Sequence, residues 1–397
     1  MSPKLEKVIT ICTHKYWLAI TLAGAFFCFF GINRGGVIVF IDLTLVFLIL
    51  NVIAGYYPLR TICGMYWIAV LICAYLLGMS ILMAPHESHH RWMKNIFRML
   101  VIIFATDCLI RKKIDNRIQL CFAFILLLAV GWQFGAYLVF NKPQGTFSNI
   151  HQLASFCILA IPILFYFFGV TSKWYRYLFV GIAIMAFDLV LLTSSRPAFL
   201  AIIISALFSS LFLVKGRYKW ICAAAVILVV TAVYVNNYAG MASQLKWLIA
   251  GLPREERLYM WSKAWEKIME NDLLHWIFGN GIGHFPVPLP PNVPIIQAVS
   301  PHNFFFDLLY LNGIIGFMLV IGGLSLLIAR VIGVAGKTRS KNKRLLAICL
   351  MVNFISWLIL CGLNFSLYSK YSIFPLAFIL GAMFVIAQPA ANKKNDT

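Results

Sequence analysis

The sequence has little charge for its length. Only 12% of its 397 residues are Asp, Glu, Lys or Arg, whereas roughly a quarter are charged in ordinary soluble domains. Acidic residues are scarcest, with 13 Asp and Glu against 33 Lys and Arg, while 62% of the chain is hydrophobic. A soluble fold cannot bury so much apolar surface. The composition therefore excludes a soluble enzyme, a disordered chain and a fibrous protein, and predicts a polytopic membrane protein.

Motifs of several soluble enzyme classes are missing as well. The chain has no complete Walker loop, no complete Rossmann glycine fingerprint and no GxSxG. None of its ten cysteines pairs as CxxC, and a free Cys in an apolar run behaves as a small hydrophobe. We therefore expect no cofactor, no disulfide framework and no metal, although His86, His89 and His90 form a cluster. The cationic excess does not indicate nucleic acid, because no basic, hydrophilic domain is present to bind it.

Twelve apolar runs approach the length of about 20 residues that a helical membrane span needs. We predict an all-α membrane protein, one domain over 1–397, with about twelve spans near residues 16–32, 36–55, 62–83, 96–110, 118–140, 153–171, 176–194, 197–214, 220–238, 304–329, 345–364 and 373–388.

The distribution of cations predicts the orientation of these spans. With the N-terminus in the cytoplasm, the inner segments carry 21 Lys and Arg and the short outer segments 6. Positive residues collect on the cytoplasmic side, so both termini are predicted to be cytoplasmic. Residues 239–303 then form one large outer loop between the ninth and tenth spans. Within it, Leu258, Trp261, Trp265 and Ile268 form an apolar stripe, which predicts an amphipathic helix from about Arg254 to Asp272 that lies on the membrane or caps the spans.

His302 is the first candidate for chemistry. It precedes the tenth span at the outer surface, where a His suits a general base that deprotonates a hydroxyl; the alternative is an interfacial His satisfied by the backbone. His302 and Asn303 are followed, after nine residues, by Gly313 and then Gly316. On a continuous helix the glycines lie below His302 on one face. They would form either a groove for a lipid tail or a close contact between helices.

Three arginines are the next candidates. Arg196 stands at the outer end of a span, where it either snorkels or clamps an anion through its guanidinium fork. Arg254 and Arg257 lie one helical turn apart beside Trp261 and are placed to hold a diphosphate, unless they belong to a solvated charged face. Gly145, Phe147 and Asn149 belong to a polar outward turn that continues to His151 and Gln152. Asp42, Asp107, Asp188 and Asp307 lie at or within spans, and the sequence assigns them no partner.

These motifs resemble the O-antigen ligase family. The run from His302 to Gly316 fits the family signature H[NSQ]x9GxxG at every fixed position. The segment from Gly145 to Asn149 resembles its Gly-x-Phe-x-Asn segment, with Gln152 in place of a commoner Asn. Ser195–Arg196, the spacing of Arg257 and Trp261, and Gly281–Ile282–Gly283 fit in the same order.

The resemblance implies a metal-independent glycosyltransferase with no cofactor, located in a bacterial inner membrane and acting at its periplasmic face. The donor is O-antigen on undecaprenyl pyrophosphate and the acceptor is a hydroxyl of lipid A–core. His302 is then the general base, giving inversion at the anomeric carbon. Arg196 and Arg257 bind pyrophosphate, with Arg254 as a second-rank candidate.

Two other functions stay open at this point. An O-antigen polymerase uses the same donor and a glycan acceptor. A polyprenyl-glycan flippase or another transporter is the alternative of a different class. Transporters carry paired polar groups or broken helices near the membrane midplane, whereas the polar candidates here are predicted at the outer surface, with only single acids nearer the midplane.

Overall fold

The computed structural model describes residues 10, 13–28, 34–55, 64–83, 90–111, 116–141, 150–171, 174, 176–213, 216, 218–237, 256–281, 285–288, 300–363 and 370–387. These residues are almost entirely helical and contain no β-strand, which confirms the all-α prediction. The helices are α2 (Lys15–Phe27), α3 (Arg34–Ile53), α4 (Gly64–Met83), α5 (His90–Arg111), α6 (Asn116–Phe140), α7 (Ile150–Val170), α8 (Arg176–Leu192), α9 (Arg196–Leu213), α10 (Tyr218–Val235), α12 (Glu256–Met269), α13 (Leu273–Phe278), α14 (Phe304–Lys337), α15 (Lys341–Leu363) and α16 (Lys370–Ala387).

Each of the twelve apolar runs overlaps one of these helices, but the helices differ in length and apolarity. Within the described ranges, α3, α4, α6, α7, α14 and α15 are long and apolar enough to cross a membrane. Helices α9, α10 and α16 contain shorter apolar stretches. The helix α5 carries Lys94, Arg98 and Asp107, and α2 has only 13 residues. A membrane protein with several helical spans is therefore supported, and the number twelve stays a prediction.

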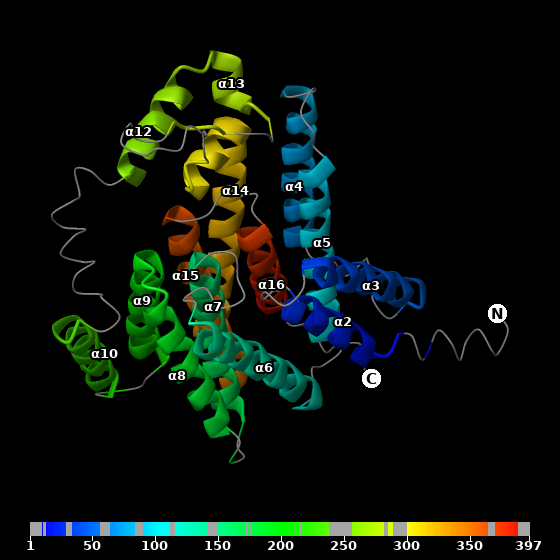
Figure 1. The fold of residues 1–397 in the computed structure, drawn as a ribbon. Helices are drawn as coiled ribbons and strands as arrows, with labels where there is room; N and C mark the ends of the chain where they lie inside the picture. Colours follow the sequence, from blue (N-terminus) through cyan, green and yellow to red (C-terminus); the bar gives the residue numbers. More distant parts are fainter. Residues whose placement is uncertain are drawn as a thin grey trace.

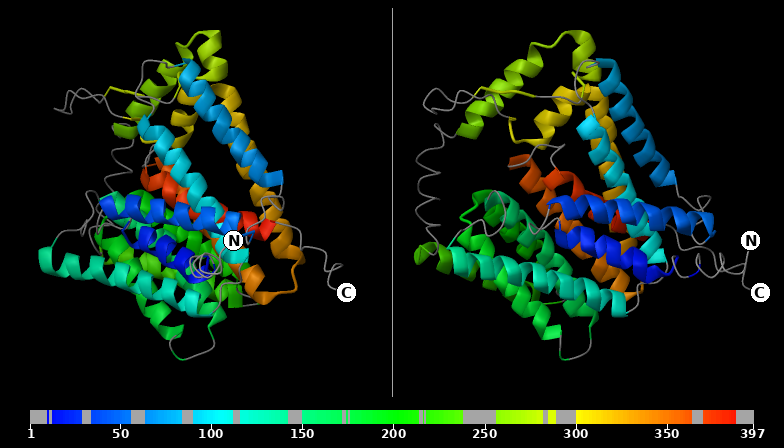
Figure 2. Two further views of the ribbon diagram at one scale, coloured as in Figure 1. Left: turned by 90° about the vertical axis from the view of Figure 1, so that its right-hand side faces the viewer. Right: turned by 45° about the vertical axis from the view of Figure 1, so that its right-hand side comes forward.

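The helices pack in two directions. In Figure 1, α4 and α14 run side by side from the end of the molecule that α13 occupies, and α12 and α13 cover that end of α14. Figure 2 shows α2, α3 and α6 lying across this direction. The helix α15 contacts α7, α9, α14 and α16, so it lies at the centre of the molecule. The sequence pattern predicts each of these helices except the short α13, and it contains no signal for the crossing directions.

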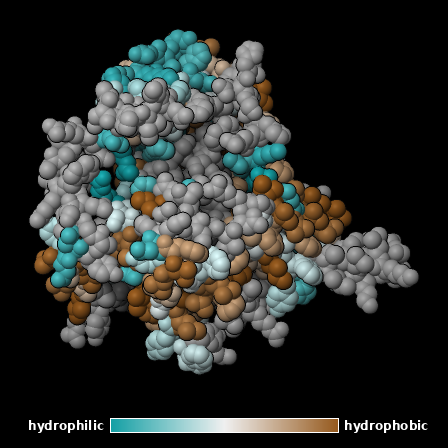
Figure 3. Space-filling model, viewed as in Figure 1, coloured by the Kyte–Doolittle hydropathy of each residue, from teal (hydrophilic) through white to brown (hydrophobic). Residues whose placement is uncertain are grey.

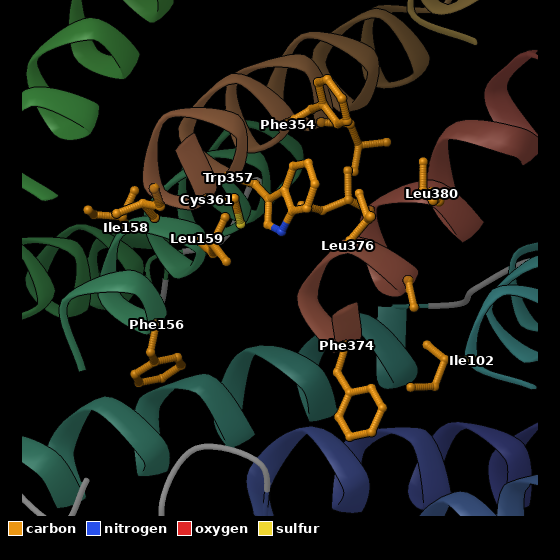
Figure 4. Close-up of a cluster of buried hydrophobic side chains, with 14 of the residues drawn as sticks. Ile102, Phe156, Ile158, Leu159, Phe354, Trp357, Cys361, Phe374, Leu376 and Leu380 are labelled. Carbon is orange, nitrogen blue, oxygen red and sulfur yellow. The ribbon is translucent and has the colours of Figure 1, made fainter. Parts of the chain in front are cut away.

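The core around α15 is apolar and aromatic. Trp357 is almost completely buried, and its ring meets Phe304, the first residue of α14, edge-on at a centroid distance of 5.3 Å. Figure 4 shows Trp357 between Leu159 of α7 and Leu376 of α16. Since aromatic pairs in this geometry add about 0.5–1.5 kcal/mol beyond burial, this contact anchors the beginning of α14 to the centre of the molecule.

Polar and apolar surfaces are separated. In Figure 3, hydrophilic residues gather at the end where Figure 1 places α12 and α13, and hydrophobic residues cover the region of α3. Large apolar side chains such as Leu71, Val139 and Leu228 are exposed. Exposed apolar residues on long helices are suited to contact with lipid, where only internal hydrogen bonds satisfy the backbone.

Candidate active site

His302 lies two residues before the start of α14 in a strained backbone conformation. Its φ is 51°, in the left-handed region that residues with a side chain rarely adopt. The residue as a whole is exposed, while Pro301 before it and Asn303 after it are buried. Two buried neighbours hold the strained residue between them, so the position of its ring is set by the tertiary structure.

Asn303 explains how α14 begins. Its side-chain oxygen accepts hydrogen bonds from the backbone N–H groups of Phe305, at 2.9 Å, and Phe306, at 3.2 Å, and thereby caps the helix. Its Nδ2 donates to the carbonyl oxygen of Gly362 on α15 at 2.8 Å. One side chain therefore begins α14 and ties it to α15 directly beside His302.

Arg196 begins α9 after a tight turn. The helix α8 ends at Leu192, and Ser194 in the turn has a φ of 52°. The buried Ser195 follows, and its hydroxyl lies 2.9 Å from Nδ1 of His151 in the first turn of α7. This hydrogen bond joins two helices whose residues are 44 positions apart.

Arg257 lies in the first turn of α12, which confirms the helix predicted in the long loop. One turn on, Nε1 of Trp261 donates to the carbonyl oxygen of Pro301 at 3.1 Å, so α12 is fastened next to His302. Near the other end of α12, Nζ of Lys267 donates to the Pro286 carbonyl oxygen at 3.1 Å and lies over the ring of Tyr310. The amphipathic helix therefore caps α14.

The buried face of α12 differs from the predicted stripe. Met260, Ala264 and Ile268 are buried, whereas Leu258 and Trp265 are 44% and 48% exposed. Ala264, whose small side chain permits close approach, lies at the centre of the face that packs on the protein. The periodicity predicted the helix and the burial of Ile268 correctly, but it placed the centre of the inner face about one residue away from the observed one.

The site brings together basic groups from four separate elements. His151 on α7 lies within electrostatic range of Arg196 on α9, Arg257 on α12 and His302 before α14. Each of these residues stands within the first turn of a helix or just before it. Helix N-termini carry partial positive charge, so the helices and the side chains all favour an anion here.

The pKa of His302 is shifted in the direction that suits a base. Although the residue as a whole is exposed, enough protein surrounds its ring to disfavour the charged form. This burial and the positive charge of Arg257 lower the pKa of His302 below its usual value of 6.5. The ring is therefore mainly neutral at pH 7.

The two signature glycines serve close packing in the structure. The helix α14 is broken at Gly313, where φ is 63° and ψ is −174°, so the continuous helix assumed for a groove below His302 is not present. A Cβ at Gly313 would collide with the Ile277 carbonyl oxygen of α13, and one at Gly316 would collide with Asn312 and press on Tyr75. Protein atoms, rather than an open groove, lie against both glycines.

The loop after α13 satisfies the break in α14. The backbone N–H groups of Asn280 and Gly281 donate to the carbonyl oxygens of Tyr310 and Leu311, both at 2.9 Å. These two carbonyls lie in the turn before Gly313, where the kink frees them from their partners further along the helix. The glycine-rich loop and the broken helix therefore form one joint.

We predict that Gly313→Ala destabilises the protein. A positive φ costs a residue with a Cβ about 1–3 kcal/mol, and the collision with the Ile277 carbonyl oxygen adds to this. The comparison is Gly322→Ala on the same helix, where a Cβ meets open space and the change is expected to be nearly neutral. Thermal aggregation of the detergent-solubilised variants measures the difference. Equal stability of the two variants would contradict the role of Gly313.

Two of the four acidic candidates are deeply buried. Asp107 lies in α5 and Asp307 in the first turn of α14. The backbone N–H of Asp307 donates to the Asn303 carbonyl oxygen at 3.0 Å, and its carboxyl group is within electrostatic range of Cys361 on α15. An acid in the first turn is favoured by the helix dipole.

Several predicted site residues lie outside the described residues, namely Arg254, Gly145, Phe147 and Asn149. Most of the histidine cluster also lies outside the described residues. His86 to His90 have the spacing HExxH, but residues 84–89 are not among those described. Within the described ranges, no group of three or more His, Cys, Asp or Glu is arranged to hold a metal ion.

A comparison with protein families bears on the same region. The break at Gly313, the α12 arginine, the Arg196 turn and His302 all fall within one segment. Residues 181–321 match the O-antigen ligase family model. The resemblance inferred from the motifs is therefore confirmed over this segment, which is just over a third of the 397 residues. Among curated proteins, none matches the chain.

The O-antigen ligase segment does not include every basic group of the site. It contains Arg196, Arg257 and His302, whereas His151 lies before it. The sequence placed His151 in a polar turn without assigning it a role, because no local pattern relates it to Ser195. Only the packing of α7 against α9 brings the two side chains into contact.

Proposed function

We propose that this protein is an O-antigen ligase. It transfers an O-antigen glycan from undecaprenyl pyrophosphate to a sugar hydroxyl of lipid A–core at the periplasmic face of the inner membrane. The family match supports a membrane glycosyltransferase of the ligase or polymerase type. The observation that carries the proposal is that His151 lies within electrostatic range of Arg196, Arg257 and His302, which belong to three other elements.

In this proposal His302 deprotonates the acceptor. Its lowered pKa keeps the imidazole neutral, so a ring nitrogen can take the proton from the attacking hydroxyl. The acceptor oxygen forms a bond to the anomeric carbon from the face opposite the pyrophosphate, and the bond from that carbon to the pyrophosphate oxygen breaks. The proton remains on His302, undecaprenyl pyrophosphate leaves, and the anomeric configuration is inverted.

Arg196 and Arg257 bind the leaving group. Guanidinium forks form paired hydrogen bonds to phosphate oxygens, and fixed cations next to a developing negative charge are usually the largest catalytic contribution. The N-termini of α7, α9 and α12 add partial positive charge. These positive charges stabilise the departing undecaprenyl pyrophosphate, so the reaction does not require a divalent metal.

We predict that the rate depends on pH through His302. The plot of kcat/KM against pH should fall on the acid side with a pKa below 6.5, because protonation removes the base. Arg257→Gln removes the charge that lowers this pKa, so the acid limb should move to higher pH, whatever the loss in absolute rate. Lys263→Gln, on the same helix but exposed and paired with Glu266, should leave the limb in place. An unchanged limb in Arg257→Gln would contradict the coupling.

A reconstitution tests the function. Purified protein is mixed with undecaprenyl-pyrophosphate-linked O-antigen and lipid A–core in excess EDTA, and the products are separated on a gel. A glycan ladder on lipid A–core that survives EDTA and disappears in His302→Ala supports a metal-independent ligase. Ligase activity that requires a divalent metal would contradict the arginine-based mechanism.

The same gel separates the alternatives. Longer glycans on the polyprenyl carrier, with no ladder on lipid A–core, would mean an O-antigen polymerase, which uses the same donor chemistry. No transfer of either kind would favour a flippase or another transporter. The basic groups of the site stand at helix N-termini rather than as polar pairs within helices, which supports an enzyme, whereas the break in α14 at Gly313 is a feature that transporters share.

A further inference from the structure

The hydrogen bond between His151 and Ser195 is the feature of the site that the proposed reaction does not use. Ser195 is 1% exposed, and its hydroxyl lies 2.9 Å from Nδ1 of His151. His151 itself is half-buried in the first turn of α7. A hydrogen bond in such a position resists exchange with water, so it holds the two helix ends at a fixed separation.

The local chain explains why this bond bears on Arg196. A serine just before a helix ordinarily caps the backbone N–H groups of the first turn. Here Pro197, the second residue of α9, has no N–H to cap, and the Ser195 hydroxyl bonds to the His151 ring. The backbone of Ser195 still begins the helix, because its carbonyl oxygen accepts from the N–H of Phe199 at 2.9 Å. The residue that bonds His151 is therefore covalently joined to Arg196.

We propose that His151 and Ser195 form a positioning pair that aligns Arg196 with the pyrophosphate of the donor. The inference rests on the proposed function. An arginine fork recognises phosphate only when its plane and distance are correct, and a misplacement of about 1 Å can cost 100-fold in rate. The chain around His302 is positioned by hydrogen bonds in a similar way, because Trp261 bonds the carbonyl oxygen of the preceding Pro301 and Asn303 bonds that of Gly362. His151 provides the third such anchor, from α7.

The test is a double-mutant cycle on donor use. His151→Ala and Ser195→Ala should each lower kcat/KM for the donor by about 10- to 100-fold, with the KM for lipid A–core unchanged. The double variant should be no worse than either single one, because both remove the same bond. His151→Asn should restore most of the activity, since an Asn amide can occupy the place of Nδ1. In an Arg196→Ala background, His151→Ala should have no further effect.

Ser155→Ala is the matched control. The Ser155 hydroxyl donates to the backbone carbonyl oxygen of His151 at 2.7 Å, so this variant removes a serine hydrogen bond one turn along α7 without touching the ring. It should behave as wild type. Binding of undecaprenyl pyrophosphate without glycan, measured in the absence of acceptor, should weaken in His151→Ala and recover in His151→Asn.

The outcomes separate this inference from the function on which it rests. If the wild type transfers no glycan, the proposed function fails first. If the wild type is active and His302→Ala is inactive, but Ser195→Ala is fully active, the positioning pair is wrong. Two other results would overturn the positioning pair in favour of direct contact between His151 and the donor. One is that the losses in kcat/KM add in the double variant. The other is that His151→Asn remains inactive while Ser195→Ala loses little activity.

Discussion

His302→Ala should abolish glycan transfer while the protein remains folded in the membrane. A general base contributes about 10²–10⁴-fold to a rate, and burial together with Arg257 lowers the pKa of His302 so that its ring can accept a proton. The other histidine near Arg257, His151, uses its ring to bond Ser195. Transfer from undecaprenyl-pyrophosphate O-antigen to lipid A–core, followed on a gel over a long time course, measures the residual rate. Full activity of the variant would remove His302 from the mechanism.

The strained backbone at His302 requires a second variant. Because φ is 51° there, Ala is less well accommodated than Asn, which adopts the left-handed conformation more readily. His302→Asn should therefore fold as well as the wild type and be as inactive as His302→Ala. The control is His275→Ala on α13, where an exposed His bonds Asp272 at 2.8 Å; this variant should remain active.

Arg257→Lys should lose most of the activity although the charge is retained. A hydrogen bond to a charged group contributes about 1.5–3 kcal/mol, and about 1.4 kcal/mol corresponds to tenfold in rate. Loss of one arm of the guanidinium fork therefore predicts a decrease of about 10- to 100-fold in kcat/KM for the donor. Arg257→Ala should lose more, about 100- to 1000-fold.

The comparison for Arg257 lies on the same helix. Lys263→Ala removes an exposed cation that is paired with Glu266, and exposed pairs of this kind contribute little. It should retain near wild-type activity, which would show that net charge on α12 is not what matters. Wild-type rates in Arg257→Lys would instead mean that a point charge suffices and that the fork is not used.

Much of the fold could be predicted because membrane helices depend on local composition. A run of about 20 apolar residues can satisfy its backbone in lipid only as a helix, and each predicted run overlaps a helix in the described part of the chain. The charged helix α12 was also predicted from its period. Its inner face was misplaced, because the stripe of largest apolar residues included Leu258 and Trp265, which face outward, while small Ala264 faces the protein.

In the site, too, the residues could be predicted from the sequence but their arrangement could not. The sequence alone was enough to single out the residues to which the proposed chemistry is assigned, since His302, Arg196 and Arg257 stand in motifs whose spacing is visible along the chain. It did not determine their meeting, because helices α7, α9, α12 and α14 come together only through packing and hydrogen bonds between distant residues. Nor did it predict the break at Gly313, because a glycine in an apolar run is compatible with a straight helix.

Tertiary structure alone decided three features, each for a physical reason. The kink in α14 exists because the loop from Gly279 to Gly281 supplies donors for the carbonyl groups it frees. The lowered pKa of His302 arises from protein and from an arginine brought in by another helix. The bond from His151 to Ser195 joins α7 to α9. Local sequence determines what each segment can form, whereas these contacts require two segments to be in place at once.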